Sequence, residues 1–427
     1  MSHPHAPRFV TSAVRLLLAA LMLAALPVAT HAQSVPASFD CAKAERTVDR
    51  FICAQAVLRW QDLAMSRLYA AAKAAVTGPA RDDLVLAQRD WLRERDRRCI
   101  ADRSFDELNA VAALHEQAYA CLDVVYLGRR RDLQDLAQPP WMPTRIAPID
   151  LKAIATARPE LVDENELLVA DMQASPDGSL LAILLPSQEI DLPDQVWLYR
   201  VADRQLVPAT PPPQAGAPAA IQALIWQDDT LYTRVSTPNP DGNSEAGIIS
   251  VHAATMAGQR RLDTVPGNIA RRLDAAETAG KVDADEMADR DADMREAARG
   301  NRDFLVWPRD LGHGTLELDM RPRRAGAPAY LVAWGSWELR AYRFDAARSQ
   351  LLYPADTGIT IFDLKTRSER RIAGTARGDR PYALSADQRL LVWATRQTCG
   401  DESLTEPDEH APLRFCLAQL PAPAKNP

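Results

Sequence analysis

The stretch Leu84–Cys99 reads LVLAQRDWLRERDRRC, and its pattern decides the fold of the N-terminal part of the chain. Its apolar residues recur at three- and four-residue steps, so they would form a stripe along one side of a helix. The same spacing recurs from Leu58 to Ala72 and from Leu108 to Leu122. The pattern predicts a short helix around Cys53 and three longer helices, packed as a small bundle.

Turn and capping residues mark the boundaries of these helices. Thr77-Gly78-Pro79 breaks the pattern between the first two long helices. Ser104 and Glu107 have the three-residue spacing of a capping box, which predicts a helix start at Ser104.

Four cysteines lie in the helical part: Cys41, Cys53, Cys99 and Cys121. A bundle of about 90 residues has a limited core, and disulfides are the usual supplement. The cysteines allow three pairings, and the sequence alone does not choose among them. We favour Cys41–Cys53 and Cys99–Cys121, because in each pair the first cysteine lies at the edge of an element and the second could return along a helix. A zinc site is the alternative, although no Cys-x-x-Cys is present and His115 is the only histidine nearby.

The first 32 residues have the pattern of an export signal. Arg8 and Arg15 precede the apolar run Leu16–Val28, and Ala29-Thr30-His31-Ala32 predicts cleavage after Ala32. A membrane anchor is the alternative, but the run is shorter than the ~20 residues that a bilayer span needs. We therefore expect a periplasmic or secreted protein with no membrane segment after cleavage, in a compartment where cysteine pairs oxidise.

Several short motifs carry a resemblance to a known family. Ser38-Phe39-Asp40-Cys41, then Ile52-Cys53, then Gln88-Arg89-x-Trp91-Leu92-x-x-Arg95-Asp96-x-x-Cys99 and finally Cys121 resemble the N-terminal domain of LprI-type lysozyme inhibitors. The resemblance covers residues 38–133. It implies a periplasmic or secreted helical module that binds a lysozyme, an enzyme that would otherwise cut peptidoglycan.

The motif also has a structural interpretation, which we favour. Trp91 and Leu92 would belong to the core, and Arg95 and Asp96 would cap neighbouring helices. The chain departs from the family's namesake because it lacks the cysteine of a lipid-anchored signal. Animal-type lysozymes are strongly basic, so an inhibitor would gain from an acidic surface.

The charge of the helical part offers no such surface. Residues 33–140 carry 16 basic and 16 acidic side chains, whereas the whole chain has a net charge of −7. The longest basic run after the signal is Arg129-Arg130-Arg131, which we expect at a solvated helix end. No clustered basic face indicates nucleic-acid binding.

Pro139-Pro140-Trp141-Met142-Pro143 ends the helical part, and we expect an extended linker over 139–159. Residues 160–427 contain short strands at regular spacing. The clearest unit is Leu167–Thr210, in which Ser175-Pro176-Asp177-Gly178 predicts a tight turn between two strands.

The same order of strands recurs along the rest of the chain. Further units are expected over 221–262, 339–372 and 381–420, and less clearly over 304–334. A repeat of about 40 residues with four strands is typical of a β-propeller blade. The first unit resembles the WD40-like repeats of TolB and of prolyl-peptidase propellers. The predicted fold class is therefore a disulfide-bonded helical bundle (33–138) followed by an all-β, propeller-like domain (160–427) of five blades, with six or seven left open and an irregular sandwich as the alternative.

Two segments of the β part stand outside the repeat. Residues 268–301 are rich in charge, and we expect a solvated helix or an insertion there. Asp289-x-Asp291-x-Asp293 invites a calcium hypothesis, but the glycine and glutamate of an EF-hand loop are missing. Cys399 and Cys416 would pair around an acidic loop and hold together the edge where the first and last blades meet.

No motif in the chain indicates catalysis. The histidines after the signal are His115, His252, His313 and His410, and none lies in a nucleophile or metal pattern. A carboxylate pair of glycosidase type cannot be selected from sequence. We therefore expect no enzyme, cofactor or metal, and a protein partner such as a lysozyme or another cell-wall lytic enzyme. An envelope scaffold that binds proteins through its propeller, or an unrecognised hydrolase, is the alternative.

Overall fold

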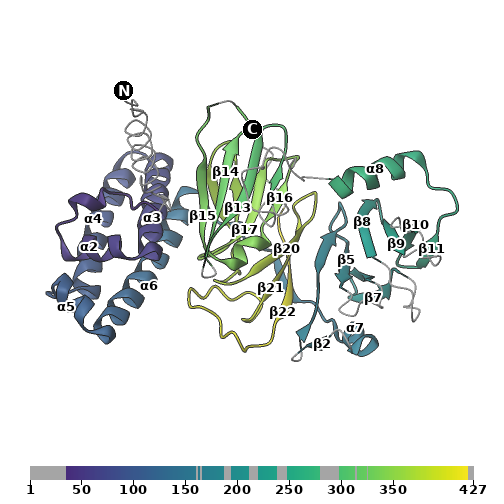
Figure 1. Ribbon diagram of the computed structural model, residues 1–427, viewed down its shortest axis with the longest axis horizontal. Helices are drawn as coiled ribbons and strands as arrows, with labels where there is room; N and C mark the ends of the chain where they lie inside the picture. The colour runs from purple at the N-terminus through teal and green to yellow at the C-terminus, as the bar shows by residue number, and fades with distance from the viewer. Residues whose placement is uncertain are drawn as a thin grey trace, which may run out of the picture.

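The computed structural model describes residues 35–421 apart from 160–161, 164–165, 187–193, 211–219, 238–247, 279–297, 313–314 and 325. The described chain forms a helical bundle followed by a series of β-sheets (Figure 1). The predicted signal and its cleavage point after Ala32 lie outside the described residues. Within the described part, no helix is long and apolar enough to cross a bilayer.

The bundle contains the short helix and the longer helices that the periodicity predicts. Its elements are η1 (Cys41–Lys43), α2 (Thr47–Ala54), α3 (Ala56–Ala75), α4 (Pro79–Cys99), α5 (Phe105–Ala110) and α6 (Ala112–Ala137). The capping box is confirmed, since Ser104 and Glu107 bond reciprocally at the start of α5. The helix expected after Ser104 is divided, because α5 ends at Ala110 and α6 begins two residues later.

Both favoured disulfides of the bundle are confirmed. Cys41 is bonded to Cys53 and Cys99 to Cys121. Each closes a short loop onto a helix, and Cys99 and Cys121 join α4 to α6 beside the apolar core. Disulfides of this kind supplement the limited burial that a small bundle achieves.

The β part is built from five antiparallel sheets of four strands each within the described residues. One sheet contains β4 (Asp171–Ala174), β5 (Leu180–Leu185), β6 (Gln195–Arg200) and β7 (Gln205–Pro208). The next contains β8 (Ala220–Gln227), β9 (Thr230–Thr237), β10 (Ile248–Thr255) and β11 (Gly258–Arg261). The third contains β12 (Arg299–Gly300), β13 (Phe304–Gly312), β14 (Thr315–Pro322) and β15 (Tyr330–Ser336). The other two contain β16 (Arg343–Asp345), β17 (Gln350–Ala355), β18 (Gly358–Asp363) and β19 (Ser368–Arg371); and β20 (Arg380–Leu384), β21 (Leu390–Thr395), β22 (Arg414–Gln419) and β1 (Arg145–Pro148).

The last sheet takes its fourth strand from the beginning of the β part. β1 lies within the segment expected to be a linker, and it pairs with β22 from Arg145↔Gln419 to Pro148↔Cys416. Residues 139–159 therefore do more than connect, because they complete the final sheet and continue into α7 (Lys152–Ala157). The proline-rich composition masked this strand, since Pro148 occupies the strand end, where proline is tolerated.

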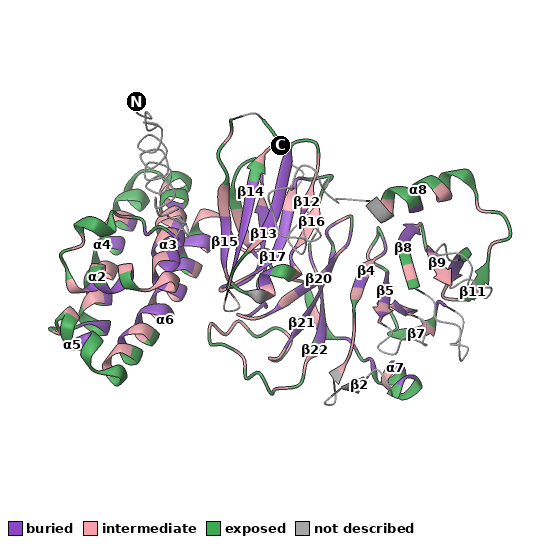
Figure 2. Cartoon of the chain, viewed as in Figure 1, coloured by how far each residue is buried: buried purple, intermediate pink, exposed green. Residues whose placement is uncertain are grey.

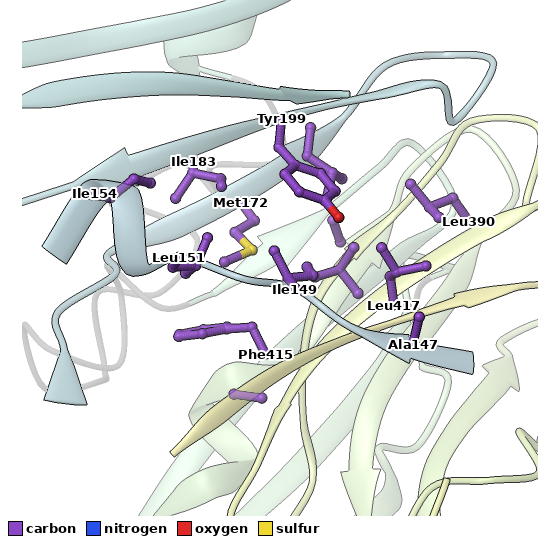
Figure 3. Close-up of a cluster of buried hydrophobic side chains, with 14 of the residues drawn as sticks. Ala147, Ile149, Leu151, Ile154, Met172, Ile183, Tyr199, Leu390, Phe415 and Leu417 are labelled. Atoms are coloured by element: carbon purple, nitrogen blue, oxygen red, sulfur yellow. The ribbon is translucent and has the colours of Figure 1, made fainter. Parts of the chain in front are cut away.

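Apolar clusters join neighbouring sheets face to face in a fixed order. The β8–β11 sheet packs on β4–β7, which packs on the β20–β22 sheet, then β16–β19 and finally β12–β15. Figure 3 shows the cluster between the β4–β7 and β20–β22 sheets, where Met172, Ile183 and Tyr199 face Leu390, Phe415 and Leu417. Among the described residues no such cluster joins β8–β11 to β12–β15, and these sheets lie apart in Figure 1. The architecture is a propeller-like arc in which β4–β7, the first four-stranded sheet along the chain, adjoins the β20–β22 sheet, the last along the chain.

A repeated turn shows why successive units fold alike. Ser175 and Asp177 bond at the turn into β5, and the Ser175 hydroxyl accepts from the Leu180 amide at 2.9 Å. Ser385 and Asp387 form the same arrangement before β21. Gly178 approaches the neighbouring turn so closely that a Cβ there would lie 2.9 Å from that of Leu390. The predicted Ser-Pro-Asp-Gly turn thus also sets the spacing of two blades.

The expectation of a solvated helix or an insertion over residues 268–301 needs correction at α8 (Gly267–Thr278). Helix α8 is not fully solvated, because Ile269 and Leu273 pack on β8 and β10. The calcium hypothesis at Asp289–Asp293 lies outside the described residues. Residues 339–344, at the start of the unit expected over 339–372, contain the end of the 3₁₀ helix η4 (Trp337–Ala341) and the start of β16. Two short strands, β2 (Val162–Asp163) and β3 (Glu166–Leu167), precede β4, and of their residues Leu167 alone falls within the unit expected over Leu167–Thr210.

Candidate functional site: the bundle and its seam with the β domain

The family motif builds the interior of the bundle. The Arg95 side chain is only 3% exposed, and its Nη1 donates to the Tyr126 hydroxyl at 2.6 Å. That hydroxyl donates to Asp62 Oδ1 at 3.1 Å, while Asp62 Oδ2 accepts from the Ser38 amide at 2.8 Å. Arg95 also lies over the rings of Trp91 and Tyr126. Burial raises the pKa of Tyr126, so its hydroxyl keeps the proton that bridges this network.

The other motif residues fall into buried and exposed groups. Gln88 is buried, where it donates to Met65 Sδ and accepts from Arg129 Nε at 2.9 Å. Phe39, Trp91 and Leu92 are half-buried, and Phe39 and Trp91 pack on the bundle core. Asp40 caps η1, whereas Arg89 is exposed. The motif is therefore largely structural, although Asp40 and Arg89 are exposed to solvent.

The expectation that Arg95 and Asp96 cap neighbouring helices is wrong. Arg95 bonds to side chains, and Asp96 forms ion pairs with Arg95 and Arg46. Arg46 is the N-cap residue of α2 and makes no side-chain cap bond. Asp96 thus reaches the start of α2 through the side chain of Arg46 and not through its backbone.

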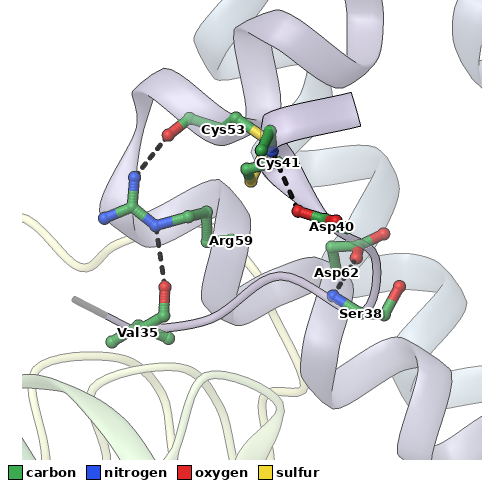
Figure 4. The surroundings of a disulfide bond; sticks show 8 residues. Val35, Ser38, Asp40, Cys41, Cys53, Arg59 and Asp62 are labelled. Carbon is green, nitrogen blue, oxygen red and sulfur yellow. Dashed lines mark hydrogen bonds between the residues drawn. A yellow bond between two sulfur atoms is a disulfide. The ribbon is translucent and has the colours of Figure 1, made fainter. Parts of the chain in front are cut away.

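An arginine secures the chain ahead of the first disulfide (Figure 4). Arg59 Nε donates to the Val35 carbonyl at 2.8 Å, and its Nη1 donates to the Cys53 carbonyl. Val35 is buried against Trp60 of α3 and Trp334 of β15. The described chain therefore begins inside the contact between the two domains, next to the Cys41–Cys53 bond.

One face of α6 docks on the β domain through buried polar contacts. Asp123 pairs with Arg377 at 2.9 Å, and Arg130 Nη1 pairs with Asp356 Oδ2 at 2.8 Å. Gln134, on the same face, accepts from the Thr357 hydroxyl at 3.0 Å. The docked residues recur at seven- and four-residue steps, which places them on one side of the helix. The two domains are therefore held in one orientation.

The expectation of a solvated helix end at Arg129–Arg131 is wrong. Arg130 is buried in the seam, and Arg131 donates to the Glu402 carbonyl at 3.1 Å. Arg129 turns inward to Gln88. The local charge pattern did not indicate this, because Asp356, which pairs with Arg130, lies more than 200 residues away in the chain.

A cleft of about 730 Å³ opens along this seam. Helix residues Trp60, Tyr119 and Arg130 line one side, and Trp334, Glu338, Asp356, Arg377, Arg380 and Glu406 line the other. The Tyr119 hydroxyl makes no hydrogen bond among the described residues. Burial and the nearby Asp123 raise its pKa to about 12. None of these side chains was predicted as a site residue. Two of them were noted in the sequence for other reasons, Arg130 in a basic run and Tyr119 in the apolar stripe of a predicted helix.

The third disulfide, Cys399–Cys416, joins the ends of the acidic loop that borders the cleft. Its expected position between the first and last blades is wrong. Cys416 packs in the cluster between the β16–β19 and β20–β22 sheets, whereas the first sheet lies on the opposite face. Pairing of β1 with β22 joins the two ends of the β domain instead. No group of metal-binding residues occurs among the described residues.

Comparison with known proteins identifies the bundle as an LprI domain. Residues 40–133 match the family model of the lysozyme inhibitor LprI. No curated protein matches the chain. Among solved structures, TolB from Acinetobacter baumannii is similar at 13% identity over 59% of this chain and 54% of that chain, with a TM-score of 0.22. A putative TolB from Agrobacterium tumefaciens is similar at 12% identity over 54% of this chain and 70% of that chain, with a TM-score of 0.20.

Proposed function

We propose that this chain is an exported binding protein whose LprI domain inhibits a lysozyme by steric blockade. The observation that carries the proposal is the family match over residues 40–133. The three disulfides support an oxidising compartment, periplasmic or extracellular, because such bonds are rare in reducing cytosol.

The docked β domain limits which surface of the bundle can act. Helices α3 and α6 supply the contacts at the seam, so their outer faces are covered. Helices α4 and α5 carry mostly exposed residues and lie away from the β domain (Figure 2). On α4, Leu86 is 56% exposed and Arg89 faces solvent. We assign the inhibitory face to α4 and α5.

Steric blockade requires a rigid binding surface and no catalytic residues. Two disulfides and the Asp62–Tyr126–Arg95 network hold the bundle in one shape. A preorganised face loses little conformational freedom on binding, which favours affinity. Exposed apolar side chains such as Leu86 and Val111 would contact the enzyme directly, since the near-neutral bundle offers little electrostatic attraction.

The test uses the full chain from residue 33, because the isolated bundle would expose the buried charges of the seam. The rate at which hen egg-white lysozyme and a bacterial lysozyme clear a peptidoglycan suspension is measured against protein concentration. A saturating loss of rate with at least one enzyme, at micromolar protein, supports inhibition. Unchanged rates with both enzymes contradict it.

A second candidate function is an envelope scaffold that binds a protein through the β domain. Ile248 and Ile249 at the start of β10 are 47% and 57% exposed, and adjacent exposed apolar residues favour a protein contact. Affinity capture from a periplasmic extract with the mature chain as bait distinguishes the two functions. A stable partner other than a lysozyme, lost in Ile249→Asp, would favour the scaffold.

A further inference from the structure

We infer that the cleft at the seam between the two domains is a binding site for an uncharged saccharide. The inference concerns the covered side of the bundle, whereas the proposed inhibitory face lies on α4 and α5. It does not depend on lysozyme inhibition.

The cleft has the size and construction of a ligand site. Its volume of about 730 Å³ lies within the usual range for small-molecule pockets. Its two walls come from different domains that buried ion pairs hold together, Asp123 with Arg377 and Arg130 with Asp356. A cleft between rigidly joined domains is preformed, so that a ligand need not order its walls.

Six of the eight charged side chains that line the cleft pair with one another, and the other two, Arg396 and Glu409, have opposite signs. Arg130 pairs with Asp356 at 2.8 Å, Arg377 with Glu406 at 2.8 Å and Arg380 with Glu338 at 3.3 Å. A phosphate or carboxylate ligand would have to displace these carboxylates from their arginines. A cationic ligand would have to displace the arginines from the same carboxylates. The paired lining therefore selects against ions of either sign.

Paired arginines and carboxylates still offer hydrogen-bonding capacity. A carboxylate has about four lone-pair positions and a guanidinium has five N–H donors, so one ion pair leaves several unused. A sugar hydroxyl both donates and accepts, and it can therefore bond to both members of one pair. The Tyr119 hydroxyl adds a group without a hydrogen-bond partner among the described residues, and like any tyrosine hydroxyl it is protonated at neutral pH and can donate.

Aromatic side chains complete the lining. Trp60 and Trp334, one from each domain, line the cleft and belong to one apolar cluster, and Tyr119 also lines it. The half-buried Tyr119 ring gives apolar contact area for the C–H face of a sugar ring, whereas Trp60 and Trp334 are only 5% and 9% exposed and add little accessible area. Hydroxyl-binding charge pairs beside aromatic surfaces are the combination that an uncharged, hydroxyl-rich ligand requires.

The test is isothermal titration of the full chain from residue 33, without any lysozyme, using tetra-N-acetylchitotetraose and maltotetraose as probes. We expect at least one to bind, and Tyr119→Phe to weaken that binding about 5-fold, equivalent to about 1 kcal/mol. Glu406→Gln, on the exposed rim of the cleft, should weaken it by a similar factor. Tyr232→Phe, on β9 of a distant sheet, is the matched control and should leave it unchanged.

Three results would overturn the inference. One is the absence of binding by either probe at millimolar concentration. Another is binding that both cleft variants leave unchanged while the thermal midpoints show all proteins folded. The third is tighter binding of inorganic phosphate or of a lysine tripeptide in the same cell, abolished by the same variants, which would assign the cleft to an ion.

Discussion

Arg371 of β19 and Asp135 of α6 form a two-point ion pair across the domain boundary. Arg371 Nε lies 3.1 Å from Asp135 Oδ1 and its Nη2 lies 2.9 Å from Oδ2. The Arg371 side chain is 5% exposed, and Glu402 approaches its Nη1 at 3.3 Å. Bidentate geometry of this kind fixes direction as well as distance. The LprI domain is thus held on the β domain in an orientation that leaves α4 and α5 outward.

Removing the acidic partner of this pair should destabilise the protein. Asp135→Asn keeps one acceptor oxygen but leaves Glu402 as the carboxylate beside the buried guanidinium, which we expect to cost about 1–3 kcal/mol of unfolding free energy. Urea unfolding followed by tryptophan fluorescence measures the loss. Asp90→Asn removes the exposed Asp90–Arg93 pair of α4 and should cost less than about 0.5 kcal/mol. Equal losses in the two variants would show that the seam contributes no special stability.

Removing the Tyr126 hydroxyl at the centre of the bundle should lower the unfolding free energy. Tyr126→Phe removes the acceptor for Arg95 and the donor to Asp62, and both partners stay buried. We expect a loss of about 1–3 kcal/mol. Tyr69→Phe, at a half-buried position with no side-chain hydrogen bond in the described part, is the matched control. A neutral Tyr126→Phe would mean that water replaces the hydroxyl.

The disulfide between α4 and α6 should contribute measurably. Cys99 and Cys121 are 22 residues apart, and a loop of that length gives about 3 kcal/mol in the chain-entropy model. The double variant Cys99→Ala with Cys121→Ala should therefore have a lower thermal midpoint. Mass spectrometry of the unreduced protein provides the independent check, because all six cysteines should be oxidised. Free thiols at these positions would contradict both the structure and the proposed compartment.

A buried carboxyl in the loop before β20 should give stability a characteristic pH dependence. Burial raises the pKa of Asp379 from 3.8 to about 7. Between these values the folded state binds more protons than the unfolded state, so this group's contribution falls as pH rises from about 4 to 7 and is constant above that. The slope reaches about 1.4 kcal/mol per pH unit in that window.

Asp379→Asn isolates this effect, because the amide does not titrate. The unfolding free energy of the wild type minus that of the variant should decrease from pH 5 to pH 7, as measured by urea unfolding at each pH. A difference that stays constant over this range would show that Asp379 is ionised in the folded protein throughout.

Local features of the fold were predictable from sequence, whereas features that join distant segments were not. The capping box at Ser104 and the pairing of Cys41 with Cys53 depend on residues a few positions apart. The strand β1 escaped prediction because its partner, β22, lies about 270 residues away in the chain. The last repeat, over 381–420, contains only three strands, and this could have indicated that its fourth strand comes from elsewhere in the chain.

The candidate site shows the same limit. Motif residues such as Arg95 could be identified, but their role inside the bundle depends on Tyr126 and Asp62 in other helices. Arg130 was expected at a solvated helix end, and nothing was expected of Asp123 or Gln134, because helical periodicity separates polar from apolar sides without revealing what covers the polar one. The cleft arises only when the two domains meet.

The central claim is that the outward face of α4 blocks a lysozyme, and a matched pair of variants tests it most directly. Leu86 on α4 and Ile249 on β10 are 56% and 57% exposed, so an aspartate at either position should leave the fold intact. The account predicts that Leu86→Asp weakens inhibition of peptidoglycan lysis at least 10-fold, while Ile249→Asp inhibits like the wild type. Equal inhibition by all three folded proteins, or a loss confined to Ile249→Asp, would contradict it.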